Sequence, residues 1–179
     1  LPVARRALEE MVRRGVTAVR LPHPVAPSLL THADTLGLRL YVDLPPAYAS
    51  AGRLQASAGA LADTLAQVLA AAARHGSIHA VGLAPLADTS VPSACAVLRR
   101  LTQQVQDRNN GTLRTYSVTP FRRDADRCAG ATDLVLLDVR DAKDPVAHWR
   151  TWQDGVGTPV GIGALGTWVR PDRDAGLQV

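Results

Sequence analysis

Apolar and polar positions along the chain follow two alternating periods, which predict helices and strands in regular succession. Apolar residues spaced three and four apart predict helices over 3–14, 27–36, 58–74, 92–108 and 122–129, and a last helix that begins at 144–145. Short apolar runs between them predict strands over 17–21, 38–44, 78–83, 113–118, 134–139 and 159–165. Because strands and helices alternate and the strands are apolar throughout, we expect a parallel sheet covered by helices.

Residues that end or begin helices fit these boundaries. Gly15 and Gly37 follow the first two helices, where a glycine is the usual stop. Asp144 is followed by a proline, the order expected of a helix cap and a first helical turn. The positions expected to face the core are Ala7, Met11 and Val12 in the first helix and Val146, Trp149 and Trp152 in the last.

Six strand and helix units favour a particular fold class. No G-x-G-x-x-G follows the first predicted strand and no G-x-x-x-x-G-K-[ST] occurs in the sequence, which argues against the nucleotide-binding doubly wound folds. A (β/α)₈ TIM-barrel-like α/β fold is the better candidate, with about six units present and the first and eighth strands missing or outside this segment. No linker-like stretch divides the 179 residues, so we expect residues 1–179 to form one incomplete barrel domain within a longer chain.

Charge and hydropathy exclude several classes of function. The net charge of +4 comes from arginines that alternate with acids along predicted helices, which is typical of a solvated surface and not of a nucleic-acid interface. The longest apolar run, over 65–73, is interrupted by Gln67 and is too short for a membrane span. The histidines lack ligand spacing with each other or with acids, so we expect no metal and no cofactor.

The two cysteines, Cys95 and Cys128, fall in predicted helices and lie far apart in the sequence. Their spacing matches neither a zinc site nor a thioredoxin-like motif. Two buried free thiols are the preferred interpretation, and one disulfide is the alternative.

Two segments near the N-terminus carry a family resemblance. Residues 15–24 read GVTAVRLPHP and residues 33–45 read ADTLGLRLYVDLP. This stretch resembles the catalytic barrel of glycoside hydrolase family 2, the β-galactosidases, β-glucuronidases and β-mannosidases, whose strand end reads G-x-N-x-x-R-x-x-H-x-P. Thr17 replaces the asparagine of that pattern. The residues that match the family are Arg20, His23, Asp34, Gly37, Asp43 and Pro45.

The resemblance continues into the segments where that family carries its two catalytic glutamates. Residues 75–86 read HGSIHAVGLAPL against H-P-S-I-x-x-W-S-x-G-N-E, so that Leu86 stands where the acid/base glutamate belongs. Residues 158–167 read TPVGIGALGT, and Ala164 stands at the position of the nucleophile. Retaining glycosidases need two carboxyl groups about 5–5.5 Å apart. The resemblance therefore implies a glycosidase-like barrel with no catalytic residues at the family positions.

The same resemblance indicates where a ligand would bind. Its candidate residues lie at or after strand ends, where barrel proteins place their sites, and Trp168 is the aromatic best placed to stack on a sugar. Asp34 is expected to hold its helix and loop, and Trp149 and Trp152 to pack the last helix on the barrel. The candidate ligand-binding residues are Arg20, His23, Asp43, Asp138 and Trp168.

Three hypotheses for function follow. The first is a non-catalytic barrel that binds an oligosaccharide or acts as a structural scaffold for other domains or subunits of a larger, envelope-associated protein; the family resemblance favours a periplasmic or extracellular location. The second is a divergent glycoside hydrolase that uses relocated acids. The third is a likeness of fold alone, with an unrelated small molecule or protein as ligand. The relocated acids of the second hypothesis would come from Asp43, Asp88, Asp138 and Asp141.

Overall fold

The computed structural model describes residues 2–45, 51–85, 89–108, 111–118, 126–139, 142–155 and 157–164. Within these ranges, six strands form one parallel sheet in which each strand pairs with the next along the chain. The strands are β1 (Ala18–Pro22), β2 (Arg39–Asp43), β3 (Ile78–Pro85), β4 (Leu113–Val118), β5 (Leu134–Asp138) and β6 (Val160–Ala164).

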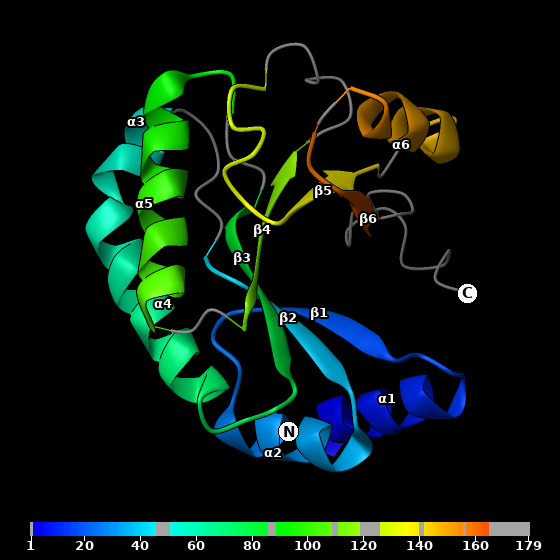
Figure 1. The fold of residues 1–179 in the computed structure, drawn as a ribbon. Helices are drawn as coiled ribbons and strands as arrows, with labels where there is room; N and C mark the ends of the chain where they lie inside the picture. The colour runs from blue at the N-terminus through cyan, green and yellow to red at the C-terminus, as the bar shows by residue number, and fades with distance from the viewer. Residues whose placement is uncertain are drawn as a thin grey trace, which may run out of the picture.

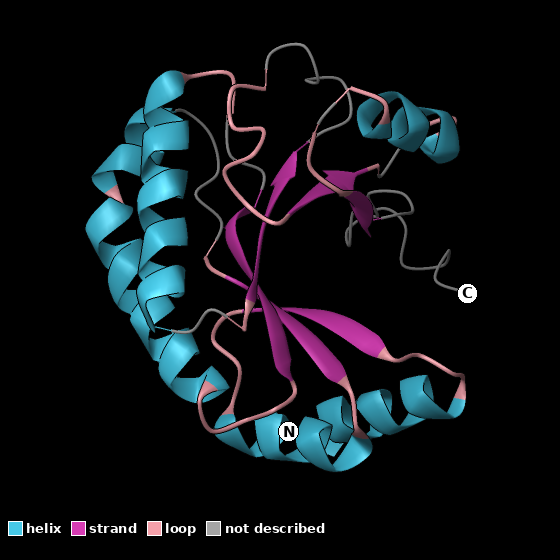
Figure 2. Cartoon of the chain, viewed as in Figure 1, coloured by secondary structure: helices cyan, strands magenta, loops and turns pink. Residues whose placement is uncertain are grey.

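The sheet curls, and the helices lie around its convex side (Figures 1 and 2). A curled, six-stranded parallel half-barrel in strictly sequential order is consistent with the predicted partial barrel, and β1 and β6 are its two edges. None of the helices in the described residues is long and apolar enough to span a membrane. The helices are α1 (Pro2–Arg13), α2 (Pro27–Leu36), α3 (Ala51–Ala56), α4 (Ala58–Ala72), α5 (Pro92–Arg108) and α6 (Pro145–Gln153).

Side-chain alternation separates the two faces of the sheet. Successive residues of a strand point to opposite faces, and the outward residues of the four inner strands, β2 to β5, are mostly apolar and buried against the helices. Leu40, Val42, Leu83, Tyr116 and Leu137 belong to this outer core and are at most 2% exposed. The opposite, concave face of the sheet, called the lumen below, carries small and polar side chains together with larger ones such as Tyr41 and Leu136.

The predicted helix ends at Gly37 and Asp144 are confirmed, and so is the one at Gly15, which follows α1 with φ of 84°. Gly37 follows α2 with φ of 66°, a left-handed conformation that favours glycine. The Asp144 side chain accepts a hydrogen bond of 2.9 Å from the backbone N–H of Ala147 at the start of α6. The turn at Gly37 leads the chain directly into β2, whose last residue, Asp43, belongs to the site described below.

Asp34 of α2 holds the loop that leads into β3, as predicted. Its Oδ2 lies 2.7 Å from His75 Nδ1, and its Oδ1 accepts a hydrogen bond of 2.8 Å from the backbone N–H of Ser77. Burial alone would raise the pKa of Asp34, but the hydrogen bonds from His75 and Ser77 outweigh it and hold that pKa below its ordinary value. The ionised carboxylate is therefore the form that ties α2 to β3.

The predictions for the two terminal helices are partly wrong. In α1 the buried residue is Leu8, with Val12 partly buried, whereas Ala7 and Met11 are exposed. The reason is that α1 packs on α2 beside the edge strand β1, so only one side of the helix has neighbours. In α6, Val146 is half exposed, but Trp149 and Trp152 pack inward as predicted. Trp152 is fully buried, and the Trp149 Nε1 donates a hydrogen bond of 2.7 Å to the carbonyl oxygen of Val160 in β6.

The preferred interpretation of the cysteines is also wrong, because Cys95 and Cys128 form a disulfide with a Cα–Cα distance of 5.0 Å. Cys95 lies in α5, but residues 126–128 are not helical. The backbone N–H of Arg127 donates to the carbonyl oxygen of Thr89, which brings the loop before β5 against the loop before α5. This contact between two loops places the cysteines together, and no spacing in the sequence reveals it.

Candidate functional site

Arg20 crosses the lumen from one edge of the sheet to the other. It extends from β1, and its Nε donates to Asp43 Oδ2 of β2 at 2.7 Å. Its Nη1 donates to the carbonyl oxygen of Gly163 in β6 at 3.2 Å, and its Nη2 donates to the hydroxyl of Ser117 in β4 at 3.3 Å. One guanidinium group therefore joins four of the six strands.

Two glycines make room for this arrangement. A Cβ placed on Gly82 of β3 would lie 1.9 Å from Asp43 Oδ1, and a Cβ on Gly163 would lie 2.7 Å from Arg20 Nη1. Neither distance is compatible with a side chain. The two charged groups can therefore occupy these positions only because Gly82 and Gly163 have no side chain. The strand residues opposite the ion pair are part of the site even though they carry no functional group.

We expect Gly82→Ala to lower the free energy of unfolding by about 1–3 kcal/mol, because the added methyl group must displace the Asp43 carboxylate from Arg20. Urea unfolding followed by circular dichroism measures the change. The matched control is Gly59→Ala in α4, whose Cβ meets nothing within 4 Å and which should leave stability unchanged or raise it by about 0.5–1 kcal/mol. Equal stability of Gly82→Ala and the unsubstituted protein would show that Asp43 is not held where the structure has it.

The electrostatics of the pair follow from its burial. Arg20 and Asp43 are 24% and 17% exposed, so both charges are mostly removed from water. Burial raises the pKa of Asp43 above its ordinary value, against the opposing effect of the hydrogen bond and charge of Arg20. A carboxylate in this environment depends on its partner, and the arginine is its compensating charge.

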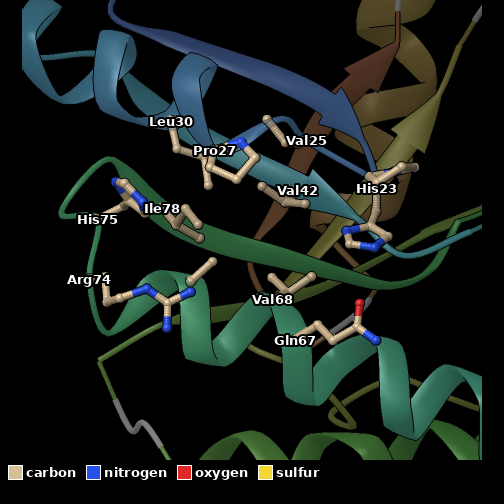
Figure 3. Close-up of a pocket in the computed structure, with 12 residues that line it drawn as sticks. His23, Val25, Pro27, Leu30, Val42, Gln67, Val68, Arg74, His75 and Ile78 are labelled. Atoms are coloured by element: carbon tan, nitrogen blue, oxygen red, sulfur yellow. The ribbon is translucent and has the colours of Figure 1, made fainter.

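His23 does not join Arg20 and Asp43, although all three were predicted as ligand-binding residues. Its backbone N–H donates to the carbonyl oxygen of Asp43 at 2.8 Å, but its imidazole lines a separate groove between α2 and α4 (Figure 3). Burial lowers the pKa of His23, which favours the neutral ring. The sheet thus separates His23 from the Arg20–Asp43 pair.

The structure describes only some of the remaining predicted site residues. Asp138 ends β5, is 7% exposed and follows Leu136 at the two-residue spacing that puts both on the lumen side. Ala164 ends β6 and pairs with Asp138 across a register shift, next to the carbonyl of Gly163 that Arg20 contacts. Leu86 and Trp168 lie outside the described residues, as do the alternative acids Asp88 and Asp141.

A cavity of about 290 Å³ lies in the lumen between the two edges of the sheet. Arg20 and Tyr41 line it from β1 and β2, and Leu136 and Gly163 line it from β5 and β6. Within the part of the chain that the structure describes, no three histidine, cysteine or acidic side chains gather where they could hold a metal ion. The polar groups of this cavity can donate and accept hydrogen bonds, and the Arg20 charge is balanced by Asp43.

Three residues of the site were not identified from the sequence. Ser117 is a polar residue in a run predicted as a buried strand. Thr115 and Ser117 are two residues apart and so lie on the same face of the strand, and their polarity could have identified that face as the lumen side. Gly82 and Gly163 lie within strands, where a glycine commonly marks the close approach of another group. Their partners come from other strands, so the contacts themselves could not be read from one segment.

No protein-family model and no curated protein matches this sequence. Solved structures do match. A glycoside hydrolase family 2 β-galacturonidase from Eisenbergiella tayi bound to galacturonate superposes on 92% of this chain with a TM-score of 0.80 at 15% identity, over 32% of its own length. A β-glucuronidase from an uncultured Clostridium species matches 89% of the chain and 31% of its own length, with a TM-score of 0.74 and 13% identity.

The β-glucuronidase of Lactobacillus rhamnosus matches similarly, over 90% of this chain and 31% of its own, with a TM-score of 0.74 and 17% identity. The chain thus spans about a third of each of these similar proteins. At such low identity the similarity establishes the fold and not the activity. The chain has the fold of part of a glycoside hydrolase family 2 enzyme.

Proposed function

We propose that this chain is part of a glycoside-hydrolase-like barrel that does not cleave glycosides and serves a longer protein as a carbohydrate-binding or structural module. The observation that supports it most is the state of the lumen. The Asp43 carboxylate is paired with Arg20 at 2.7 Å, and Arg20 also contacts the carbonyl of Gly163, immediately before the position where the family carries its nucleophile.

The family mechanism requires two carboxyl groups that act as one unit, and removal of such a unit removes nearly all of the rate enhancement. By the resemblance, its two positions in this chain are Leu86 and Ala164. Neither side chain can protonate a leaving group or attack an anomeric carbon. This substitution supports the loss of activity.

A second candidate, hydrolysis by relocated acids, is favoured by one observation. The pKa of Asp43 is raised by burial, as a general acid requires, and Asp138 lies on the same face of the sheet. Against it, Asp43 is held by the guanidinium of Arg20. An acid that must donate its proton to a substrate would first have to leave that ion pair.

The disulfide between Cys95 and Cys128 supports the proposed compartment. Disulfides form and persist in oxidising environments such as the periplasm and the cell exterior. A module that binds envelope or extracellular polysaccharides would work in such a compartment. We therefore include a periplasmic or extracellular location in the proposal.

The test is calorimetric titration of the full-length protein with plant and bacterial oligosaccharides, with turnover of aryl glycosides followed on the same samples. The panel includes galacturonate- and glucuronate-containing sugars, because the similar solved structures are a β-galacturonidase and β-glucuronidases. Binding without turnover would support a carbohydrate-binding module, and neither would support a structural one. Turnover that is lost in Asp138→Asn would overturn the proposal in favour of the second candidate.

A further inference from the structure

A groove separate from the lumen lies on the outer side of the sheet, between α2 and α4 (Figure 3). Its floor is apolar and is formed by Val42 of β2, Ile78 of β3 and Val68 of α4. Polar side chains stand at its two ends: His23 and Gln67 at one, and Arg74 and His75 at the other. The groove therefore combines an apolar middle with polar ends.

The size of the groove limits its occupant. Its volume is about 270 Å³, and a water molecule takes about 30 Å³ of liquid, so the groove holds about nine waters or one organic molecule of roughly ten non-hydrogen atoms. This volume is just below the range typical of pockets for drug-sized ligands. A small molecule fits within the groove, whereas an oligosaccharide would extend beyond it.

The charged residues around the groove indicate which charge its ligand should carry. No acidic residue lines it, and the guanidinium of Arg74 has no ion-pair partner among the described residues. Asp34 and Arg74 both line a neighbouring hollow, but the carboxylate of Asp34 is already bound to His75 and to the backbone of Ser77. The positive charge at this end is therefore available to an anion, and a bidentate carboxylate is the anion that an arginine binds best.

We propose that this groove is a binding site for a small amphipathic carboxylate, with the carboxylate on Arg74 and an apolar body of about six to eight carbons over Val42, Val68 and Ile78. The apolar body of the ligand would cover the apolar floor of the groove, and its carboxylate would pair with the guanidinium of Arg74. The site lies on the face of β2 opposite the Arg20–Asp43 pair. It is independent of the function proposed for the lumen, so either proposal can fail without the other.

The first experiment is titration of the ¹⁵N-labelled protein with 3-phenylpropionate and with the uncharged 3-phenylpropionamide, followed by NMR. About ten non-hydrogen atoms in an open groove correspond to a Kd of about 0.1–1 mM. We expect the carboxylate to bind in this range and to shift the backbone signals of Val42, Val68 and Arg74, and the amide to bind at least about fivefold more weakly. Absence of binding, equal binding of the two compounds, or shifts outside the groove would overturn the proposal.

Variants then assign the contacts. Arg74→Gln should weaken 3-phenylpropionate binding about fivefold or more, because it removes the charge but keeps a long polar side chain. The matched control is Arg99→Gln, an exposed arginine of α5 that does not line the groove and should leave the Kd unchanged. Ala71→Met, on the groove side of α4, should fill the space and abolish binding while keeping a good helix former. Unchanged affinity in Arg74→Gln or in Ala71→Met would refute the assigned site.

Discussion

Arg20→Met is expected to lower the free energy of unfolding by about 2–3 kcal/mol at pH 7. The substitution keeps much of the side-chain volume but leaves the Asp43 carboxylate buried without its compensating charge. Breaking a buried ion pair costs about 3–5 kcal/mol, and the lower figure applies here because the two side chains are still 24% and 17% exposed. Two further hydrogen bonds, to Ser117 and to the Gly163 carbonyl, are lost with the guanidinium.

The pH dependence of this loss identifies its cause. The pKa of Asp43 in the folded protein is already raised above its ordinary value by burial, and the loss of Arg20 raises it further. A carboxyl group whose pKa is raised on folding contributes stability in its protonated form, and this contribution disappears as the pH rises through the folded pKa. The deficit of Arg20→Met should therefore be larger at pH 7 than near pH 4.

Urea unfolding of the unsubstituted protein, Arg20→Met and Arg20→Met/Asp43→Asn at both pH values tests this explanation. The double variant should recover part of the stability at pH 7, because it removes the unpaired charge. Arg13→Met is the control, since the Arg13–Glu10 pair is exposed and should contribute less than about 1 kcal/mol. A deficit that does not change with pH, or a double variant no more stable than Arg20→Met, would contradict the role given to Asp43.

Removal of the disulfide has the other large expected effect. Cys95 and Cys128 are 33 residues apart, and closing a loop of this length stabilises the folded state by about 4 kcal/mol in the chain-entropy treatment, of which about 2–4 kcal/mol is commonly realised. Both residues are buried, so Cys95→Ala/Cys128→Ala also loses some packing. We expect a loss of about 2–4 kcal/mol, measured by urea unfolding in the absence of reductant.

Thiol titration in denaturant is the companion measurement and should find no free thiol in the unsubstituted protein. Reduction before unfolding should reproduce most of the loss seen in the double alanine variant. Single variants are less informative, because each leaves one reactive thiol. Two titratable thiols, or a double variant of undiminished stability, would contradict the disulfide.

The succession of elements could be predicted from the sequence because it depends on local patterns. Apolar periodicity located every strand of the described sheet within a few residues, and Gly37 and Asp144 marked helix ends that the structure confirms. Apart from the helix predicted over 122–129, whose described residues 126–129 are not helical, the predictions that failed concern contacts between segments. The face of α1 depends on which side has a neighbour, and the disulfide depends on the contact between Thr89 and Arg127.

The candidate site could also be predicted only in part from the sequence. Position at a strand end correctly brought Arg20 and Asp43 into one site, because the carboxyl ends of parallel strands share an edge of the sheet. The same rule placed His23 with them, but His23 directly follows β1, three residues after Arg20, and its ring lies on the helix side of the sheet. Strand alternation puts residues three apart on opposite faces, so it separates His23 from Arg20, whereas position at a strand end does not distinguish the two faces.

Turnover of aryl glycosides by the full-length protein is the most direct test of whether the lumen is catalytic. We expect no hydrolysis above that of a heat-denatured sample for β-galactosides, β-glucuronides, β-galacturonides or β-mannosides between pH 4 and 8. Hydrolysis that depends on enzyme concentration and disappears in Asp43→Asn or Asp138→Asn would contradict it. That result would mean that the carboxyl groups of this lumen carry out the chemistry that Leu86 and Ala164 cannot.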